Sequence, residues 1–217
     1  MTPKFNLAAT TAFIDPFRAT NYLEVVAFFR WQLQSESGGH VRANNGTSIE
    51  TQPIDEVSPD IPDFLIISSR WEPEAHVSPP VAAMLRRAGV AGTTLGGIDT
   101  GAFVLAHTGL LKGHRATVHY ELIDALQELF PDTQVEESLL VFDGARITCC
   151  GGVASGEFAL HILRRLLGST IADAAARYVS SRNIRDHNAP QNPQDSKPLG
   201  ATVPDTVRWT NEVMEET

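Results

Sequence analysis

The sequence predicts an α/β fold, namely a flavodoxin-like three-layer α/β/α sandwich built on a mainly parallel sheet. Strand-like apolar runs alternate with helical patterns along most of the chain. Residues 63–68, DFLIIS, form a continuous apolar run, as in strands buried on both faces of a parallel sheet. Residues 93–101 add a sharp passage from strand to helix, and ligands of such sheets bind where strands end. The 217 residues, 42% of them hydrophobic, are enough for one such domain.

The first half of the chain is expected to begin with a strand and then alternate. The predicted elements are a strand at 4–9, a helix at 13–29, a strand at 30–36, a hairpin at 37–52, a strand at 63–68 and a helix at 79–89. Asp15 is the expected N-cap of the first helix, with Pro16 at its first position, where a missing N–H costs nothing. Asn45-Gly46 supplies the turn of the hairpin, and Gly89 ends the helix at 79–89.

The second half continues the alternation up to residue 181. The predicted elements are a strand at 93–98, a helix from Gly101 to about His107, a strand at 115–120, a helix at 121–130, a hairpin at 137–152 and helices at 155–168 and 169–181. Pro131 stops the helix before it, Asp143-Gly144 makes the hairpin turn, and Ser169 is the expected cap of the last helix. Residues 1–181 are therefore predicted to form one domain.

Beyond residue 181 the composition changes. Residues 182–203 are rich in Asn, Pro, Gln and Asp and are predicted to form a linker or arm, because they offer little apolar surface to bury. Residues 204–217 begin an amphipathic helix that has no stop signal, which predicts that the natural chain continues.

Composition narrows the class of protein. The net charge of −9 argues against DNA binding by this stretch alone, since DNA phosphates require a basic face. No apolar run reaches the roughly 20 residues of a membrane span, and no signal peptide is evident, so we expect a cytoplasmic protein. The two cysteines, Cys149 and Cys150, are adjacent strand residues, and neither a disulfide nor a zinc site is expected. No cofactor or metal is predicted.

The most informative stretch is the corner Gly97-Ile98-Asp99-Thr100-Gly101. It has the G-x-nucleophile-x-G arrangement, in which small residues let a tight turn present one side chain. The residue at the tip is Asp99, where an enzyme normally carries Ser or Cys. The first question is therefore whether the corner does chemistry.

Three enzyme classes can be compared with the sequence. A hydrolase with Asp99 as nucleophile needs a histidine well downstream, whereas His119 follows after only twenty positions. A cysteine-hydrolase arrangement fits the spacing from Asp99 to His119, but a carboxylate of pKa about 3.9 is a poor nucleophile. A metal hydrolase would use Asp15, Asp99, His119 and Glu157, without any tight metal-binding spacing.

The alternative is a ligand sensor. Asp99 at the mouth of a cleft would attract an ammonium group, and aromatic side chains nearby would add cation–π attraction. The predicted ligand-binding residues are Asp15, Arg70, Trp71, Asp99, Thr100, His119 and Tyr120. All but Thr100 also have a structural explanation. Asp99 would stabilise the turn, Asp15 would cap a helix, His119 would hold a loop and Tyr120 would start the next helix. Trp71 would be a core or interface aromatic, and Arg70 would pair with surface acids.

At this point two segments resemble a known family. They are GGIDTGAFVLAHTGLLKGHRATVHYE and ELFPDTQVEESLLVFDGARITCCGG, supported by IDPFRATN at 14–21. They are similar to the N-terminal domain of AraC-type transcriptional regulators of the GlxA group. That domain has the DJ-1/PfpI fold, which is like the class-I glutamine amidotransferases, and the resemblance covers about residues 4–195.

The resemblance implies a regulatory function, and Asp99 departs from the pattern of the enzymes in the same superfamily. In enzymes of that superfamily a cysteine stands at the position of Asp99, a histidine at His119 and an acidic residue near Asp15, so Asp99 puts hydrolase, amidase or deglycase activity in doubt. The regulators place a helix-turn-helix DNA-binding domain after the sensor, which would follow residues 204–217. The expectation is a homodimeric sensor of a small nitrogenous metabolite, such as an amino acid, a betaine-like amine or a polyamine, that reaches DNA only through a further domain.

Overall fold

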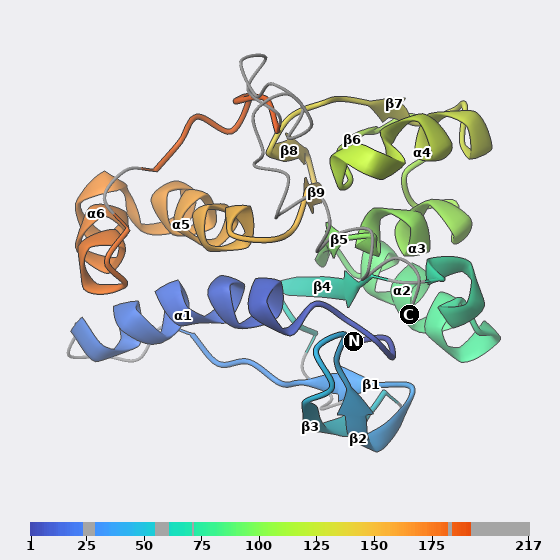
Figure 1. Ribbon diagram of the computed structural model, residues 1–217, viewed down its shortest axis with the longest axis horizontal. Helices are drawn as coiled ribbons and strands as arrows, with labels where there is room; N and C mark the ends of the chain where they lie inside the picture. The colour runs from blue at the N-terminus through green and yellow to red at the C-terminus, as the bar shows by residue number, and fades with distance from the viewer. Residues whose placement is uncertain (24–28, 55–60, 71, 182–183, 192–217) are drawn as a thin grey trace, which may run out of the picture.

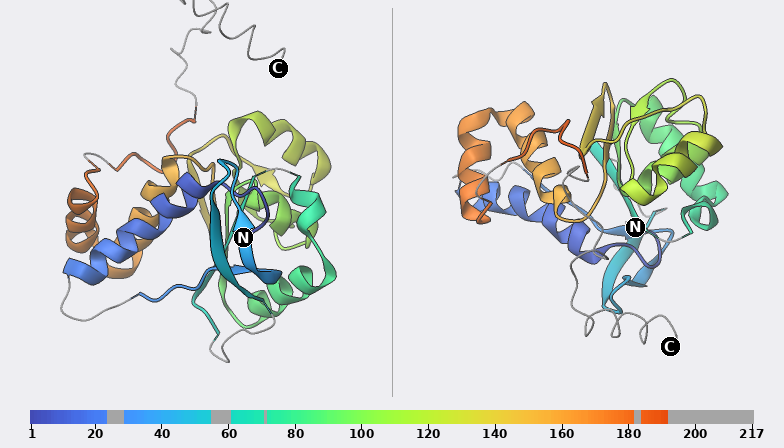
Figure 2. Two further views of the ribbon diagram at one scale, coloured as in Figure 1. Left: turned by 60° about the horizontal axis from the view of Figure 1, so that its bottom comes forward. Right: turned by 45° about the horizontal axis from the view of Figure 1, so that its top comes forward.

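The computed structural model describes residues 1–23, 29–54, 61–70, 72–181 and 184–191. A four-stranded sheet lies between two layers of helices, with α1, α5 and α6 on one side and α2, α3 and α4 on the other (Figures 1 and 2). The strand order is β4 (Phe64–Ser69), β5 (Thr94–Asp99), β9 (Arg146–Cys149), β8 (Leu140–Asp143). Neighbouring strands are parallel except for β8, which runs antiparallel to β9. The predicted three-layer α/β fold is confirmed.

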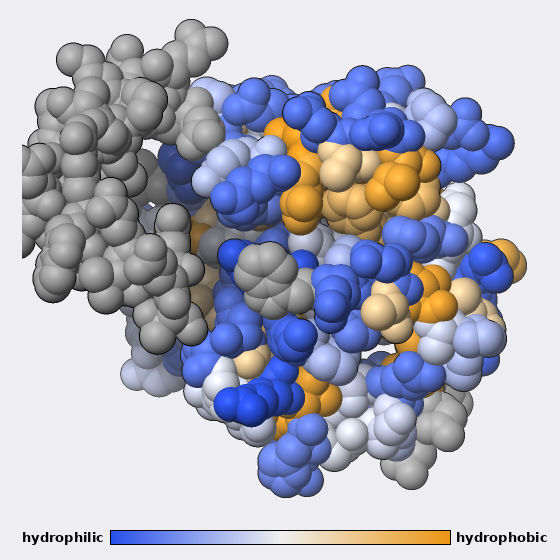
Figure 3. Space-filling model, turned by 45° about the vertical axis from the view of Figure 1, so that its right-hand side comes forward, coloured by the Kyte–Doolittle hydropathy of each residue, from blue (hydrophilic) through white to orange (hydrophobic). Residues whose placement is uncertain are grey.

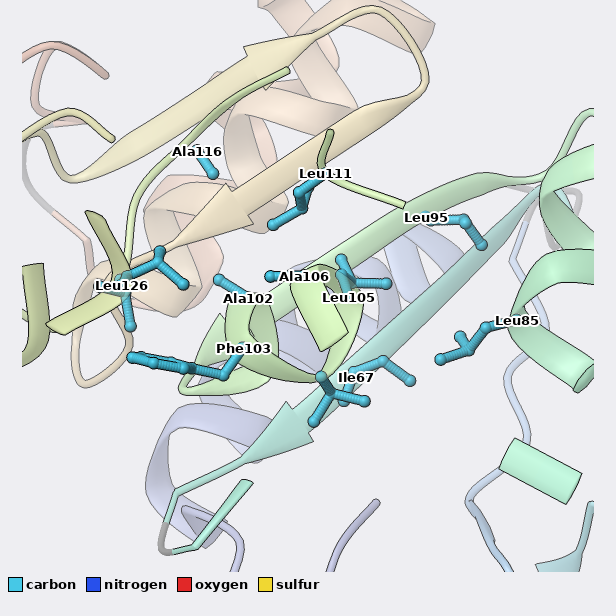
Figure 4. Close-up of a cluster of buried hydrophobic side chains, with 12 residues drawn as sticks. Ile67, Leu85, Leu95, Ala102, Phe103, Leu105, Ala106, Leu111, Ala116 and Leu126 are labelled. Atoms are coloured by element: carbon cyan, nitrogen blue, oxygen red, sulfur yellow. The ribbon is translucent and has the colours of Figure 1, made fainter. Parts of the chain in front are cut away.

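Each face of the sheet buries its own hydrophobic cluster. The cluster under α3 (Gly101–His107) joins Ile67, Leu95 and Leu105, and Figure 4 shows these side chains within it. The opposite cluster joins Ile98 to Phe158 of α5 (Ala154–Leu167). Because α3 is buried along nearly its whole length, the corner from which it starts is held rigidly.

The chain opens differently from the prediction. Residues 4–9 form no strand, because α1 already begins at Leu7 and continues to Leu23. Asn6 caps it, since its side-chain oxygen accepts a hydrogen bond from the backbone N–H of Ala9 at 3.1 Å. Asp15 is therefore not the N-cap but lies two turns inside the helix, together with Pro16. The Asp-Pro signal was misread because Asn6 provides an earlier cap.

A small second sheet lies at one end of the four-stranded sheet (Figure 2, left). It contains β1 (Gln34–Ser35), β3 (Ser48–Pro53) and β2 (Ser37–Arg42), in that order. The hairpin of β2 and β3 around Asn45-Gly46 is confirmed. The strand predicted at 30–36 shortens to the two residues of β1, which pair in parallel with the end of β3.

The middle of the chain follows the prediction with one exception. Ser78 caps α2 (Pro79–Val90), and β5 and α3 fall where they were expected. The strand predicted at 115–120 is only β6 (Arg115–Ala116), which pairs with β7 (Gln134–Val135). A short 3-10 turn, Tyr120–Leu122, then leads into α4 (Ile123–Leu129). A further 3-10 turn, Pro73–His76, precedes α2.

The last elements of the domain are the β8–β9 hairpin, α5 and α6 (Ser169–Tyr178), as predicted. Ser169 is the first residue of α6 rather than its cap, since Gly168 occupies the cap position. Cys149 and Cys150 are both free thiols and buried. Among the described helices, none is long and apolar enough to cross a membrane.

Part of the predicted linker packs against the domain. In residues 184–191, which we call the closing segment, the carbonyls of His187 and Ala189 accept hydrogen bonds from the backbone N–H groups of Leu140 and Leu139. The amide of Gln191 donates to the carbonyl oxygens of Val118 and Ser138. This segment was predicted as a linker or arm because it is polar, but two of its carbonyl groups accept hydrogen bonds at the outer edge of β8. The predicted helix at 204–217 lies outside the described residues.

Candidate functional site

The corner between β5 and α3 is a tight elbow with Asp99 at its tip. Asp99 has φ of 60°, in the left-handed region that few side chains other than Asn and Asp adopt. A Cβ on Gly97 would lie 2.6 Å from the backbone nitrogen of Ala102, and one on Gly101 would collide with the carbonyl oxygen of Ile67. The two glycines are therefore required by close backbone approach, and the G-x-D-x-G motif is a genuine elbow.

The Asp99 carboxylate is buried and already paired. Its side chain is 1% exposed, and its Oδ2 accepts hydrogen bonds from Arg70 Nη1 at 2.8 Å and Asn6 Nδ2 at 3.0 Å. On another side, Gly151 approaches so closely that a Cβ there would lie 2.9 Å from the Cβ of Asp99. The elbow thus joins the start of α1, the end of β4 and the loop after β9.

Because Arg70 pairs with Asp99, the exposed charge at the elbow is positive and not negative as predicted. Asp99 was expected to project a bare carboxylate into a cleft, but Arg70 covers it, and the Arg70 side chain is 25% exposed. Both described hydrogen bonds end on Oδ2, so Oδ1 accepts none from the described residues. The guanidinium of Arg70 is therefore the part of this ion pair that reaches the surface, and the Asp99 carboxylate lies buried beneath it.

Thr100 adds an unsatisfied polar group beside Asp99. It is 1% exposed, and its hydroxyl oxygen has no hydrogen-bond partner among the described residues. Buried polar atoms without partners are uncommon, because leaving one unpaired costs about 1–3 kcal/mol. The elbow therefore carries a buried hydroxyl group that no described residue uses as a hydrogen-bond partner.

His119 and Tyr120 form a second group, on the turn that leads into α4. Their rings lie 4.5 Å apart between centroids, and His119 Nδ1 is 3.4 Å from a carboxylate oxygen of Glu121. Tyr120 is 43% exposed. No hydrogen bond within the described part of the chain joins this group to Asp99 or Arg70.

The remaining predicted site residues do not join the elbow. Asp15 accepts a hydrogen bond from Arg18 at 2.6 Å, and the Arg18 guanidinium lies over the ring of Tyr178, on the side of α1 that meets α6. Trp71 lies outside the described residues. In the described ranges, no group of three His, Cys, Asp or Glu side chains is placed to hold a metal ion.

Several residues at the site were missed by the sequence analysis. Asn6 was placed in a strand, yet it contacts Asp99. Cys149 pairs in register with Ile98, so Cys150 follows the same strand ends as Asp99. Burial raises the pKa of the Cys149 thiol, whereas the hydrogen bond from Cys149 lowers the pKa of Cys150, with a further contribution from the positive charge of Arg185.

The positive charge near Cys150 comes from the closing segment. Arg185 Nε lies 2.9 Å from both carboxylate oxygens of Glu157, whose side chain is 11% exposed. The hydrogen bond to Glu157 is the main cause of the raised pKa of Arg185. The one signal in the sequence was Glu157 itself, an acid at the start of the largely apolar helical pattern 155–168. An acid that becomes buried there requires a cation as its partner.

Comparison with known proteins places this fold and elbow in a family. The sequence profile described as the DJ-1/PfpI family matches residues 9–165. The chain belongs to the DJ-1/PfpI family. Within the matched region lie the elbow, Arg70 and His119, whereas Asn6 and Arg185 lie outside it.

The similar curated proteins of this DJ-1/PfpI chain are transcriptional regulators. The HTH-type transcriptional regulator CdhR of Pseudomonas aeruginosa is 34% identical over 99% of the chain and 63% of the regulator. The HTH-type transcriptional regulator GlxA of Rhizobium meliloti is 26% identical over 92% of the chain and 62% of that protein. The chain thus spans less than two thirds of the length of these relatives.

Solved structures confirm the DJ-1/PfpI fold. An AraC family transcriptional regulator from Pseudomonas putida superposes with a TM-score of 0.70 at 22% identity, covering 82% of this chain and 95% of the other. Drosophila melanogaster DJ-1beta gives a TM-score of 0.72 at 20% identity, covering 84% and 96%. At these identities the likeness concerns the fold.

Proposed function

We propose that this chain is the effector-sensing domain of a DNA-binding transcriptional regulator. Its relatives are regulators longer than the chain, and helix-turn-helix regulators contact DNA through that motif. The acidic net charge of −9 supports a division of labour in which a separate domain binds DNA. Residues 1–181 form the sensor in this proposal, 182–203 connect it, and 204–217 lead toward the DNA-binding domain. The sensor works as a homodimer, which matches two-fold DNA half-sites.

The single observation that carries the proposal is the pairing of the partly exposed Arg70 with the buried Asp99, at an elbow whose tip residue is a carboxylate and not a thiol. The effector is a small nitrogenous metabolite: an amino acid, a betaine-like amine or a polyamine. The pair favours the first two, because both carry a carboxylate that the partly exposed guanidinium of Arg70 can bind, while Asp99 fixes the position of that guanidinium. Thr100 offers a hydrogen bond, and the rings of His119 and Tyr120 suit a quaternary nitrogen.

We also propose that the elbow has no hydrolase, amidase or deglycase activity, which is the alternative that the fold allows. A paired carboxylate is a weak nucleophile, and here its Oδ2 is already occupied by two donors. Asp15 and Trp71 stay predicted ligand contacts.

The test is a calorimetric titration of nitrogenous metabolites into the wild type and Asp99→Asn. Asparagine tolerates the left-handed backbone and keeps the shape of the elbow. It removes the charge that holds Arg70 in place and the negative charge of the site, so we expect affinity to fall roughly ten- to a hundredfold, at about 1.4 kcal/mol per factor of ten.

Lys112→Gln is the matched control, because Lys112 lies beyond the opposite end of α3 from the elbow and forms an exposed ion pair with Asp132. It should leave affinity unchanged. Equal affinities for the wild type and Asp99→Asn would show that Asp99 only stabilises the turn. Ester or amide turnover that disappears in Asp99→Asn would instead assign the chain to the enzymes.

A further inference from the structure

The closing segment is anchored at the strand end that leads to His119. The side-chain amide nitrogen of Gln191 lies 2.8 Å from the carbonyl oxygen of Val118 and 3.0 Å from that of Ser138. It also lies 3.1 Å from the hydroxyl oxygen of Thr117. Thr117 and Val118 are fully buried, and His119 follows them directly in the chain. Gln191 therefore holds the backbone immediately before one of the predicted ligand contacts.

A second line of contacts runs from the closing segment to the elbow. The backbone N–H of Leu139 donates to the carbonyl of Ala189 at 3.0 Å, and the carbonyl of Leu139 accepts from the N–H of Cys150, also at 3.0 Å. The next residue, Gly151, lies so close to Asp99 that a Cβ on it would be 2.9 Å from the Asp99 Cβ. Two backbone hydrogen bonds and one close contact thus connect the segment to the tip of the elbow.

Charges act over the same short distance. The pKa of Cys150 is lowered most by the hydrogen bond from Cys149, and burial opposes that effect. Among the charged groups, Arg185 lowers this pKa and Asp99 raises it. A cation of the closing segment and the tip residue of the elbow therefore act on the same thiol, so the electrostatic potential beside the elbow depends on where the segment lies.

Hydrogen bonds hold the closing segment in place more than apolar burial does. None of residues 184–191 is buried, and Ile184 and Ala189 are only partly buried against two hydrophobic clusters. Figure 3 shows hydrophobic residues exposed in several areas on the side of α2, α3 and α4, whereas the segment lies beside β8 (Figure 1). Segments with few buried apolar contacts open at a lower cost than the core. The closing segment can therefore leave the sheet while the sheet stays folded.

We propose that the closing segment is coupled to the elbow, so that docking of residues 184–191 and the paired arrangement of Asp99 and Arg70 stabilise each other. This inference rests on the proposed sensor function, in which a ligand binds at the elbow and residues 182–203 connect the sensor to the DNA-binding domain. A ligand that orders the elbow and His119 also orders both places where the segment is attached, and it favours the docked state. By linkage, docking raises the affinity for that ligand by the same factor.

Gln191→Glu is the variant that detaches the segment. A carboxylate has nearly the size of the amide but no N–H to donate, and its negative charge would face the oxygens of Val118 and Ser138. Asn188→Asp is the matched control, because it makes the same chemical change at an exposed position of the same segment.

Amide hydrogen exchange at Leu139 and Leu140 is the readout, because their N–H groups donate to the closing segment. The N–H of Leu95 in β5 is the internal reference for unfolding of the sheet. Without ligand, Gln191→Glu should speed exchange at both amides roughly tenfold relative to Leu95, since local opening becomes easier. Asn188→Asp should leave the exchange rates unchanged.

Asp99→Asn tests the coupling itself. In otherwise wild-type protein it should speed exchange at Leu139 and Leu140 roughly threefold, and beside Gln191→Glu it should have little effect, because coupled changes are not additive. An equal effect of Asp99→Asn in both backgrounds, or an effect in neither, would overturn the proposal.

Glycine betaine, which carries a carboxylate and a quaternary nitrogen, is the ligand probe. If it binds the wild type more tightly than Asp99→Asn, it should slow exchange at Leu139 and Leu140, and Gln191→Glu should weaken its binding. Bound glycine betaine that leaves both amides unchanged would also overturn the proposal. Absence of binding would count against the sensor proposal alone, because exchange in the unliganded proteins already decides the coupling.

Discussion

The two edge strands of the four-stranded sheet, β8 and β4, differ in how their outer backbone groups are hydrogen-bonded. The outer edge of β8 is covered by the closing segment, which accepts hydrogen bonds from Leu139 and Leu140. The outer edge of β4 has only one such partner among the described residues, the N–H of Thr2. Unpaired edges tend to recruit other strands. The difference indicates that one outer edge of the sheet is completed by a polar segment of the same chain, whereas the backbone groups on the outer edge of β4 have few partners among the described residues.

Removing the closing segment is the strongest way to test this comparison. We expect residues 1–181 to unfold roughly 10 °C below residues 1–191, because the loss of several hydrogen bonds of about 1 kcal/mol each adds to about 3 kcal/mol. The shorter protein should also aggregate sooner, since β8 becomes an open edge. Equal unfolding midpoints of the two proteins in calorimetry would mean that the closing segment does not stabilise the domain.

A single contact of that segment should have a smaller effect. Arg185→Met leaves Glu157 nearly buried without its cation, while Met keeps much of the side chain's volume. We expect a loss of about 1 kcal/mol in urea unfolding, reduced from the value for a fully buried pair because Arg185 is 47% exposed. Lys112→Met, which breaks an exposed pair, is the control. If the two variants lose the same free energy of unfolding, the contact with Glu157 stabilises the protein no more than an exposed ion pair does.

The smallest expected effect is a pH dependence at the same edge. Burial is the main cause of the lowered pKa of His161, and the charges of Arg164 and His187 lower it further. The hydrogen bond between His161 Nε2 and the carbonyl of Arg185, and the charge of Glu157, act in the opposite direction. The unfolded chain then binds the proton more readily, so stability is fully present above about pH 6.5 and falls as the pH drops below it. His161→Gln should flatten this slope in urea unfolding at pH 7.5 and 5.5. If stability depends on pH equally in the wild type and His161→Gln, a group other than His161 is responsible for the dependence.

The sequence alone was sufficient wherever a signal is local. The dipeptides Asn45-Gly46 and Asp143-Gly144 placed both hairpins, because few residues other than Asn, Asp and Gly tolerate the turns involved. The apolar run of β4 and the glycines beside Asp99 placed the sheet and the elbow. Family resemblance then predicted a regulator domain, and the similar proteins are regulators.

Tertiary structure decided which polar groups meet. Asn6 and Asp99 are 93 residues apart, Arg70 and Asp99 are 29 apart, and Glu157 and Arg185 are 28 apart. Turn and capping signals extend over only a few residues, so they could not predict that Asp99 would be covered or that a polar linker would pair with β8. These contacts form because burying a carboxylate requires a partner, and the partner is whichever donor the packed helices and strands bring within reach.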